Sequence, residues 1–214
     1  LTDPSVLDRL KKEQEEALAL DNKTIDKVAP GEQQPEVDHK MEIVNSTTGT
    51  HQGEFYRDAG QCSGGEGGSI SYEFETNSED SLSLMVRYWG NEGCTRAFDI
   101  MIDNEKLASE NISGKWNKDE FVNVTYPIPD KMVKEKSIIR VKFQASAGMV
   151  GGIYGVRLLR NKPKPETTKI IVGRGEDVVK SVPQFRARAT QETLELETGA
   201  PLQGKKKKKI YGMD

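Results

Sequence analysis

The chain has 214 residues, enough for one sizeable domain with additional segments or for two small domains. Hydrophobic residues make up 35% of it and charged residues 30%, and no stretch approaches the ~18 consecutive apolar residues that a membrane helix requires, which argues against a membrane span. The formal charge of −3 combines 19 basic and 27 acidic residues in 1–160 with 12 basic and 7 acidic residues in 161–214, and so acidic a main segment argues against nucleic acid as a partner.

Residues 1–40 are expected to form a helix and a linker. Asp3 is a suitable N-cap and Pro4 occupies the first helical position. The apolar residues that follow fall near one helical face: Val6, Leu7, Leu10, Ala17 and Leu18. Residues 21–38 are polar and carry the chain breakers Pro30-Gly31 and Pro35, so they are expected to connect rather than to form a core.

Residues 41–160 change to a pattern in which apolar and polar residues alternate, typical of strands with one buried and one wet face. The clearest stretches are 70–74, 82–88, 98–102, 122–126, 139–143 and 152–159. Turn signals separate them, and no long helix lies between them. About seven to nine short strands in this arrangement predict an antiparallel β-sandwich or barrel.

Residues 161–214 contain few apolar side chains and include the lysine run Lys205–Lys209. Such a segment cannot bury enough apolar surface to form its own core. It is expected to be a basic, partly extended tail.

The two cysteines, Cys62 and Cys94, allow a geometric argument. If 70–74 and 82–88 pair as a hairpin, the two cysteines lie at the same end of the ribbon, in two glycine-rich loops, close enough for a disulfide. A disulfide would indicate an oxidising compartment such as a periplasm. If those strands belong to opposite sheets, the register says nothing, and the alternative is two free thiols.

Several separate motifs, in order, carry a family resemblance: Pro30–His39, Tyr56–Ala59, Ser71-Tyr72, Val86–Gly90, Phe98–Ile100 and Gly151–Arg160. Over about residues 7–160 the chain resembles the C-terminal β-sandwich region of the β-L-arabinofuranosidase-type glycoside hydrolases (glycoside hydrolase family 127 and relatives). More distantly, it is similar to carbohydrate-binding modules of the galactose-binding-like type. The resemblance implies an all-β, jelly-roll or galactose-binding-like sandwich over residues 41–160.

In that family an upstream helical barrel does the chemistry and the sandwich is accessory. The resemblance therefore implies a non-catalytic accessory domain of a periplasmic or extracellular glycoside hydrolase acting on arabinose-containing glycans, packed against its catalytic domain. The alternative is a carbohydrate-binding module that recognises plant polysaccharide through an exposed aromatic side chain.

Six residues are candidates for contacting a sugar: Tyr56, Arg57, Asp58, Arg87, Trp89 and Trp116. By alternation Trp89 lies on the polar face of its strand, beside Gly90–Gly93, where an exposed indole could stack on a sugar ring. The alternative is that it packs under the N-terminal helix or a neighbouring loop. Trp116 is a second loop candidate. Arg87 points to the same polar face as Trp89.

Arg57 and Asp58 follow the aromatic pair Phe55-Tyr56 in a short strand. Together they could bind adjacent sugar hydroxyls through directional hydrogen bonds. The alternative is a structural ion pair between the two.

No catalytic or zinc-binding residue is predicted. His39 and His51 have no acidic or cysteine partner at metal-ligand spacing. Galactose-binding-like modules often hold calcium, but Ile153–Val156 offers no clear match to the aspartate they use, so calcium is left open only for carboxylates and carbonyls elsewhere. Acidic residues alternate along outer faces instead of meeting in a cleft as glycosidase carboxylates do.

Overall fold

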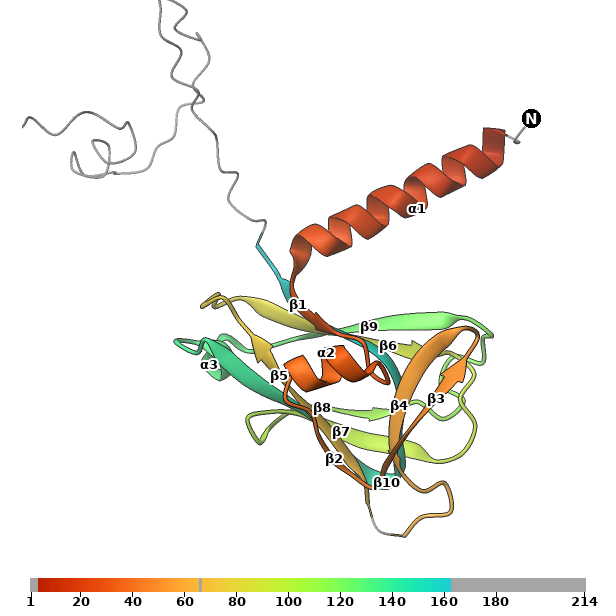
Figure 1. The fold of residues 1–214 in the computed structure, drawn as a ribbon, viewed down its shortest axis with the longest axis vertical. Helices are drawn as coiled ribbons and strands as arrows, with labels where there is room; N and C mark the ends of the chain where they lie inside the picture. The colour runs from red at the N-terminus through yellow and green to blue at the C-terminus, as the bar shows by residue number, and fades with distance from the viewer. Residues whose placement is uncertain (1–3, 66, 163–214) are drawn as a thin grey trace, which may run out of the picture. The chain divides into compact units, whose positions relative to one another are not determined.

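The structure is a computed structural model that describes residues 4–65 and 67–162. The predicted tail lies outside the described residues from residue 163 onward. The elements in chain order are α1 (Pro4–Lys23), β1 (Thr24–Val28), α2 (Gln33–Asp38), β2 (Glu42–Val44), β3 (Ser46–His51), β4 (Glu54–Gly60), β5 (Ser69–Glu75), β6 (Leu82–Trp89), β7 (Arg96–Ile102), β8 (Glu105–Asn111), β9 (Phe121–Pro127), α3 (Asp130–Val133) and β10 (Ile138–Arg160) (Figure 1).

The strands form two antiparallel layers, here called sheet A and sheet B, which share the long strand β10. The second half of β10 lies inside sheet A, between β6 on one side and β1 and β4 on the other, with β9 beyond β6 and β3 beyond β4. The first half lies inside sheet B, between β5 and β7, with β2 and β8 at the edges. This confirms the predicted all-β sandwich of jelly-roll type.

The core lies between the two sheets, where the predicted alternation places the apolar side chains. In β6, Val86 and Tyr88 are fully buried, and they face Phe98 and Phe143 among others from sheet B. The one hydroxyl that Tyr88 brings into this core is hydrogen-bonded to the Tyr126 hydroxyl at 3.1 Å. The buried hydroxyl group therefore has the hydrogen-bond partner that it needs.

Glycines mark the place where β10 leaves sheet B and enters sheet A. Gly148 has a φ of +70°, and a Cβ built there would lie 2.1 Å from the carbonyl oxygen of Thr95. Only glycine combines this backbone conformation with so close an approach of a neighbouring chain. The sequence predicted two strands, at 139–143 and 152–159; the structure has one strand that bends between them.

Residues 24–38, expected to be a polar connector, instead contribute β1 and α2 to the sandwich. β1 pairs with β10, with Val28 opposite Val156. α2 is fixed by the buried carboxylate of Glu36, which receives hydrogen bonds from Arg57 and Tyr72. The connector has few apolar residues because a buried polar contact attaches it in addition to the packing of Ile25 and Val28 on the core.

The hairpin assumed for 70–74 and 82–88 is wrong, because β5 lies in sheet B and β6 in sheet A. Cys62 and Cys94 nevertheless form a disulfide, with a Cα–Cα distance of 5.5 Å. The shared strand β10 explains this: the end of β4 pairs with it at Met149, and the start of β7 pairs with it at Gly148. The two cysteine loops therefore meet over β10, and Met149 Sδ lies 3.7 Å from both sulfur atoms.

Candidate functional site

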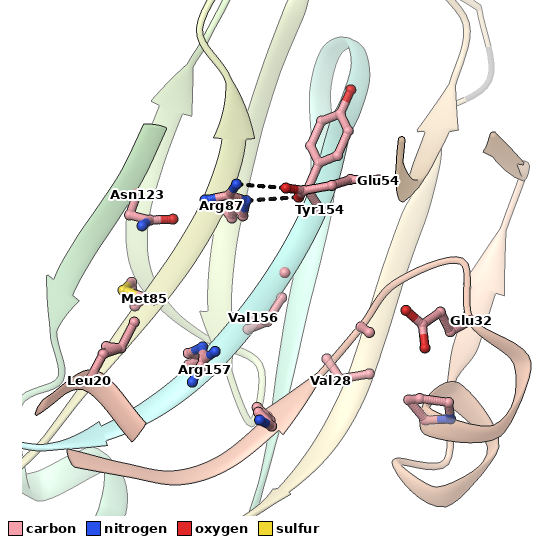
Figure 2. A pocket seen from close by; sticks show the side chains of 14 residues that line it. Leu20, Val28, Glu32, Glu54, Met85, Arg87, Asn123, Tyr154, Val156 and Arg157 are labelled. Atoms are coloured by element: carbon pink, nitrogen blue, oxygen red, sulfur yellow. Dashed lines mark hydrogen bonds and ion pairs between the residues drawn. The ribbon is translucent and has the colours of Figure 1, made fainter. Parts of the chain in front are cut away.

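A groove of about 500 Å³ runs over the outer face of sheet A, and we call it the sheet A groove. It is built from six elements: the end of α1, β1, the start of α2, β4, β6 and β10, with one residue from β9. Its apolar floor comes from the side chains of Leu20, Met85 and Tyr154, because those of Val28 and Val156 are 3% and 0% exposed and belong to the core. Its polar side chains come from Lys27, Glu32, Glu54, Arg87, Asn123 and Arg157, most of which are labelled in Figure 2.

Arg87 is the candidate residue that reaches this groove. Its neighbours Val86 and Tyr88 face the core, so strand alternation turns Arg87 outward, as the sequence predicted. Its Nε and Nη2 atoms donate to the two carboxylate oxygens of Glu54 at 2.9 and 2.7 Å (Figure 2). The guanidinium also lies 4.3 Å from the ring centroid of Phe121. A half-exposed donor–acceptor pair is thus held in a fixed orientation.

Aromatic rings continue from the groove across the same face. Tyr154, which lines the groove, packs against Phe121 at 4.9 Å and against Tyr56 at 5.4 Å between ring centroids. Phe121 and Tyr56 are each half-buried. Tyr56, predicted to contact a sugar, therefore belongs to a row of rings beside the groove.

Trp89 extends this row, but it is not the exposed platform that the sequence suggested. Its exposed fraction is 8%. It packs edge-on against Phe121 from β9 at 5.1 Å and against His51 from β3 at 4.6 Å. Alternation correctly placed the indole on the outer face, but side chains from β3 and β9 cover it there. The indole is therefore packed, although by strands and not by the N-terminal helix or a loop.

Trp116 lies apart from this row. Its ring stacks on Tyr88 at 6.0 Å, and Lys115 Nζ lies 5.0 Å from its centroid. Because Tyr88 faces the core, Trp116 closes the core from a loop and does not join Trp89 in one surface.

Arg57 is buried and cannot reach a ligand in the groove. Its Nε and Nη2 atoms each donate to a carboxylate oxygen of Glu36 at 2.6 Å. The Tyr72 hydroxyl and the Gly31 N–H donate to the same carboxylate, both at 2.9 Å. Burial alone would raise the pKa of Glu36, but these hydrogen bonds outweigh it and lower that pKa. Arg57 therefore pairs with Glu36, and not with Asp58 as the structural alternative proposed.

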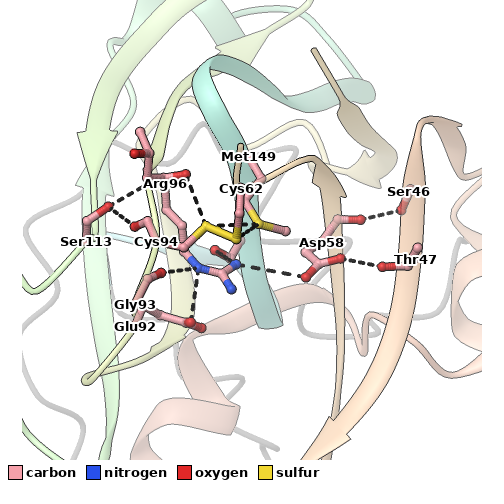
Figure 3. A network of polar contacts seen from close by, with 12 residues as sticks. Ser46, Thr47, Asp58, Cys62, Glu92, Gly93, Cys94, Arg96, Ser113 and Met149 are labelled. Carbon is pink, nitrogen blue, oxygen red and sulfur yellow. Dashed lines mark hydrogen bonds and ion pairs between the residues drawn. A yellow bond between two sulfur atoms is a disulfide. The ribbon is translucent and has the colours of Figure 1, made fainter. Parts of the chain in front are cut away.

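Asp58 points to the opposite face of β4 and joins a polar network beside the disulfide (Figure 3). It accepts a hydrogen bond from the Thr47 hydroxyl at 2.6 Å, and Arg96 Nη1 lies 3.9 Å from it. Arg96 also donates to the Gly151 carbonyl at 2.5 Å and pairs with Glu92 at 3.1 Å. Burial raises the pKa of Glu92. This network fixes loops, and it holds Asp58 away from the sheet A groove.

Sequence reasoning missed most of the groove. Glu54, Asn123, Tyr154 and Arg157 come from three different strands, β4, β9 and β10, and no spacing in the sequence connects the three strands. A correct strand pairing would have brought together Arg87 with Asn123 across β6 and β9, and Met85 with Arg157 across β6 and β10. In the described part of the chain, no group of three or more His, Cys, Asp or Glu could hold a metal ion. Nor does any helix there have the length and apolarity to cross a membrane.

No curated protein matches the sequence. Many solved structures are similar to it, and three of them serve as examples. The first is a family 35 carbohydrate-binding module from Clostridium thermocellum, with 15% identity, coverage of 62% of this chain and 96% of that chain, and a TM-score of 0.42. The second is the CBM35 of Abf62 from Cellvibrio japonicus, with 13% identity, coverage of 56% of this chain and 86% of that chain, and a TM-score of 0.41. The third is the C-terminal CBM6 of LamC from Zobellia galactanivorans, with 13% identity, coverage of 63% of this chain and 98% of that chain, and a TM-score of 0.41. Similarities at this level assign no function to the chain.

A family profile gives the firmer result. It matches residues 19–159, which run from the last turn of α1 to the end of β10 and so cover every strand of the described sandwich. The chain thus belongs to DUF6805, a family of unknown function.

Proposed function

We propose that the chain is a carbohydrate-binding domain and that the sheet A groove is its binding site. The observation that carries the proposal is the half-exposed pair of Arg87 and Glu54 above an apolar floor. Sugars present hydroxyl groups that both donate and accept hydrogen bonds, together with apolar C–H faces. A fixed donor–acceptor pair beside apolar side chains complements both, and prior orientation of the pair lowers the entropic cost of binding.

The size and construction of the groove support the same function. Small-molecule sites usually measure roughly 300–1,000 Å³ and combine an apolar lining with a few fixed polar groups. The sheet A groove, at about 500 Å³, falls in that range. Asn123 adds an exposed amide, which also both donates and accepts, next to Arg87 on the neighbouring strand.

The test is glycan retention by an Arg87→Ala variant in affinity electrophoresis through gels containing arabinan, galactan or arabinogalactan. Loss of the guanidinium removes the ordered pair, so retention should fall by about tenfold or more in apparent Kd. Arg140→Ala is the matched control, since Arg140 forms a comparable half-exposed pair with Glu73 at 2.8 Å on sheet B. Thermal denaturation verifies that both variants fold. Equal retention of both, or no retention of the native chain, would refute the proposal.

We further propose that the domain serves a glycoside hydrolase acting on arabinose-containing glycans, in a periplasm or outside the cell. The sequence motifs shared with the β-L-arabinofuranosidase-type enzymes support the first part. The Cys62–Cys94 disulfide supports the second, because disulfides persist in oxidising compartments.

A second candidate function is docking to a catalytic domain through α1. Leu7, Leu10 and Leu18 lie near one face of this helix and are 44%, 50% and 62% exposed. A helix with such a stripe is stabilised when another surface covers it. In co-purification with a catalytic domain of this enzyme type from the same source, Leu10→Asp should abolish association, whereas Glu16→Ala on the opposite face should not. Association that survives Leu10→Asp would contradict docking through this stripe.

A further inference from the structure

Each cation that lines the sheet A groove has a carboxylate beside it. Three cations line it: Lys27, Arg87 and Arg157. Arg87 is paired with Glu54. Arg157 donates to Asp21 at 2.6 Å, and Lys27 Nζ lies 3.9 Å from the same carboxylate.

A third carboxylate, Glu32, lines the groove at the start of α2. The hydrogen bond from Arg157 lowers the pKa of Asp21, so this partner is ionised at neutral pH. The three cations are therefore accompanied by three carboxylates: Asp21, Glu32 and Glu54. The lining residues alone carry a formal charge of +1, and Asp21, which pairs with Arg157 and Lys27 beside the groove, brings the sum to zero.

From this balance we infer that the groove selects uncharged glycans over glycans that carry uronic acids, an inference that rests on the proposed function. The carboxylate of a uronic acid can only accept hydrogen bonds. To reach Arg87 it would have to displace Glu54 or lie beside it, and placing like charges together lowers affinity.

The remaining hydrogen-bonding capacity at the Arg87–Glu54 pair suits hydroxyl groups instead. Glu54 accepts from Nε and Nη2 of Arg87, so the pair does not use the N–H groups of Nη1. Each Glu54 oxygen accepts one of these bonds and retains a second lone pair. A hydroxyl can accept a hydrogen bond from an Arg87 N–H group and donate one to a Glu54 oxygen, whereas a carboxylate can only accept from Arg87. The same holds for the Asn123 amide, which both donates and accepts.

Calorimetric titration with two sets of oligosaccharides tests the inference. One set is uncharged, from arabinan and galactan; the other is oligogalacturonide of the same length. The native chain should bind the uncharged set about tenfold or more tightly. Its affinity for that set should be the same at low and at high salt, because no net ionic attraction is screened.

The decisive variant is Glu54→Gln, which keeps the shape of the side chain and frees Arg87. It should shift the ratio of affinities toward oligogalacturonide by about tenfold. Glu73→Gln, which removes a carboxylate from Arg140 on sheet B, is the matched control and should leave the ratio unchanged. A native preference for oligogalacturonide, or an unaltered ratio in Glu54→Gln, would overturn the inference while leaving carbohydrate binding intact. Absence of binding to both sets would overturn the proposed function and this inference with it.

Discussion

Glu36 connects three separate segments of the sandwich through its carboxylate. It lies in the six-residue helix α2, is 2% exposed, and receives hydrogen bonds from β4, from β5 and from the turn at Gly31. With two oxygens engaged by Arg57 and one shared with Tyr72, its carboxylate is fully used. A buried charge held this way is stable only while its partner is present.

We expect Glu36→Gln to be strongly destabilising. The variant leaves the Arg57 guanidinium buried without its counter-charge, and breaking a buried pair costs about 3–5 kcal/mol of the free energy of unfolding. Urea denaturation at neutral pH measures this. Glu105→Gln is the control, because the Lys131–Glu105 pair is exposed and should contribute about 1 kcal/mol or less. If both variants lost a similar amount of the free energy of unfolding, the buried Glu36–Arg57 pair would contribute no more to stability than an exposed pair.

His39 links the end of α2 to β1 in a way that favours its charged form. Its Nδ1 lies 2.6 Å from the Pro35 carbonyl oxygen, and its Nε2 lies 3.0 Å from Asp26 Oδ1. Both partners only accept hydrogen bonds, so both ring nitrogens must donate. The hydrogen bond to Asp26 accordingly raises the pKa of His39, although burial opposes the shift. Burial opposes ionisation of Asp26, but its bonds from His39 and from the Glu75 N–H lower its pKa.

This pair makes stability depend on pH in a defined direction. Because the pKa of His39 is higher in the folded state, its contribution is complete below the unfolded value of about 6.5 and is lost as pH rises through the folded value. The contribution of Asp26 is lost at the acidic end, as pH falls through its lowered pKa. The free energy of unfolding should therefore be larger at about pH 6 than at about pH 9.

The measurement is urea denaturation at both pH values for the native chain and for His39→Gln. The variant cannot be protonated, so the difference between the two pH values should shrink. Comparing variant with native chain cancels the contributions of other titrating groups, Glu92 among them. An identical pH dependence in both proteins would count against the His39–Asp26 pair as its source.

At the scale of elements, the sequence predicted which side chains of a strand are buried, but it did not predict which strands pair. Ile70, Tyr72 and Phe74 are buried as their period of two predicted. Their strand pairs with β10, more than sixty residues later in the chain, and not with the next strand. A period of two fixes which face of a strand is buried, whereas the choice of neighbour depends on contacts that are distant in sequence.

For the candidate site, too, the sequence predicted the face on which a side chain lies but not whether neighbouring strands cover it. Arg87 and Trp89 share the outer face of β6, as alternation requires. Whether each is open to a ligand depends on β3 and β9, which cover Trp89 and leave Arg87 half-exposed. Glu54, the partner of Arg87, carries no local signal, because an acidic residue at the start of a strand is common at protein surfaces.

The disulfide acts between two elements, joining the loop after β4 to the loop before β7. Its cysteines are 32 residues apart, and closing a loop of that length restricts the unfolded chain by about 3–4 kcal/mol. We expect a Cys62→Ser, Cys94→Ser double variant to lose a comparable part of the free energy of unfolding. Urea denaturation with and without dithiothreitol checks this: the reductant should destabilise the native chain and leave the double variant unchanged. A native chain indifferent to reduction would contradict the prediction.

At the scale of the whole molecule, the sandwich as a folding unit begins in the last turn of α1, and the earlier turns of that helix lie outside it. The family match begins at residue 19, within the last turn of α1. The same last turn supplies Leu20 and Asp21, which belong to the sheet A groove and to its Arg157 ion pair. The preceding turns carry exposed leucines and two ion pairs between exposed side chains, Arg9–Glu13 and Lys12–Glu16. Such pairs stabilise a helix only weakly.

Removal of residues 1–18 should therefore leave the sandwich and its groove intact. The melting temperature should change by no more than about 2–4 °C, the shift that 1 kcal/mol produces in a protein of this size. Removal of residues 1–28 is the control. It deletes β1, whose Val28 is 3% exposed and pairs with β10, so cooperative melting and glycan retention should both be lost. If the shorter deletion also abolished cooperative melting, α1 would be an integral part of the fold. Its exposed leucines would then not be the docking surface for a catalytic domain that we propose.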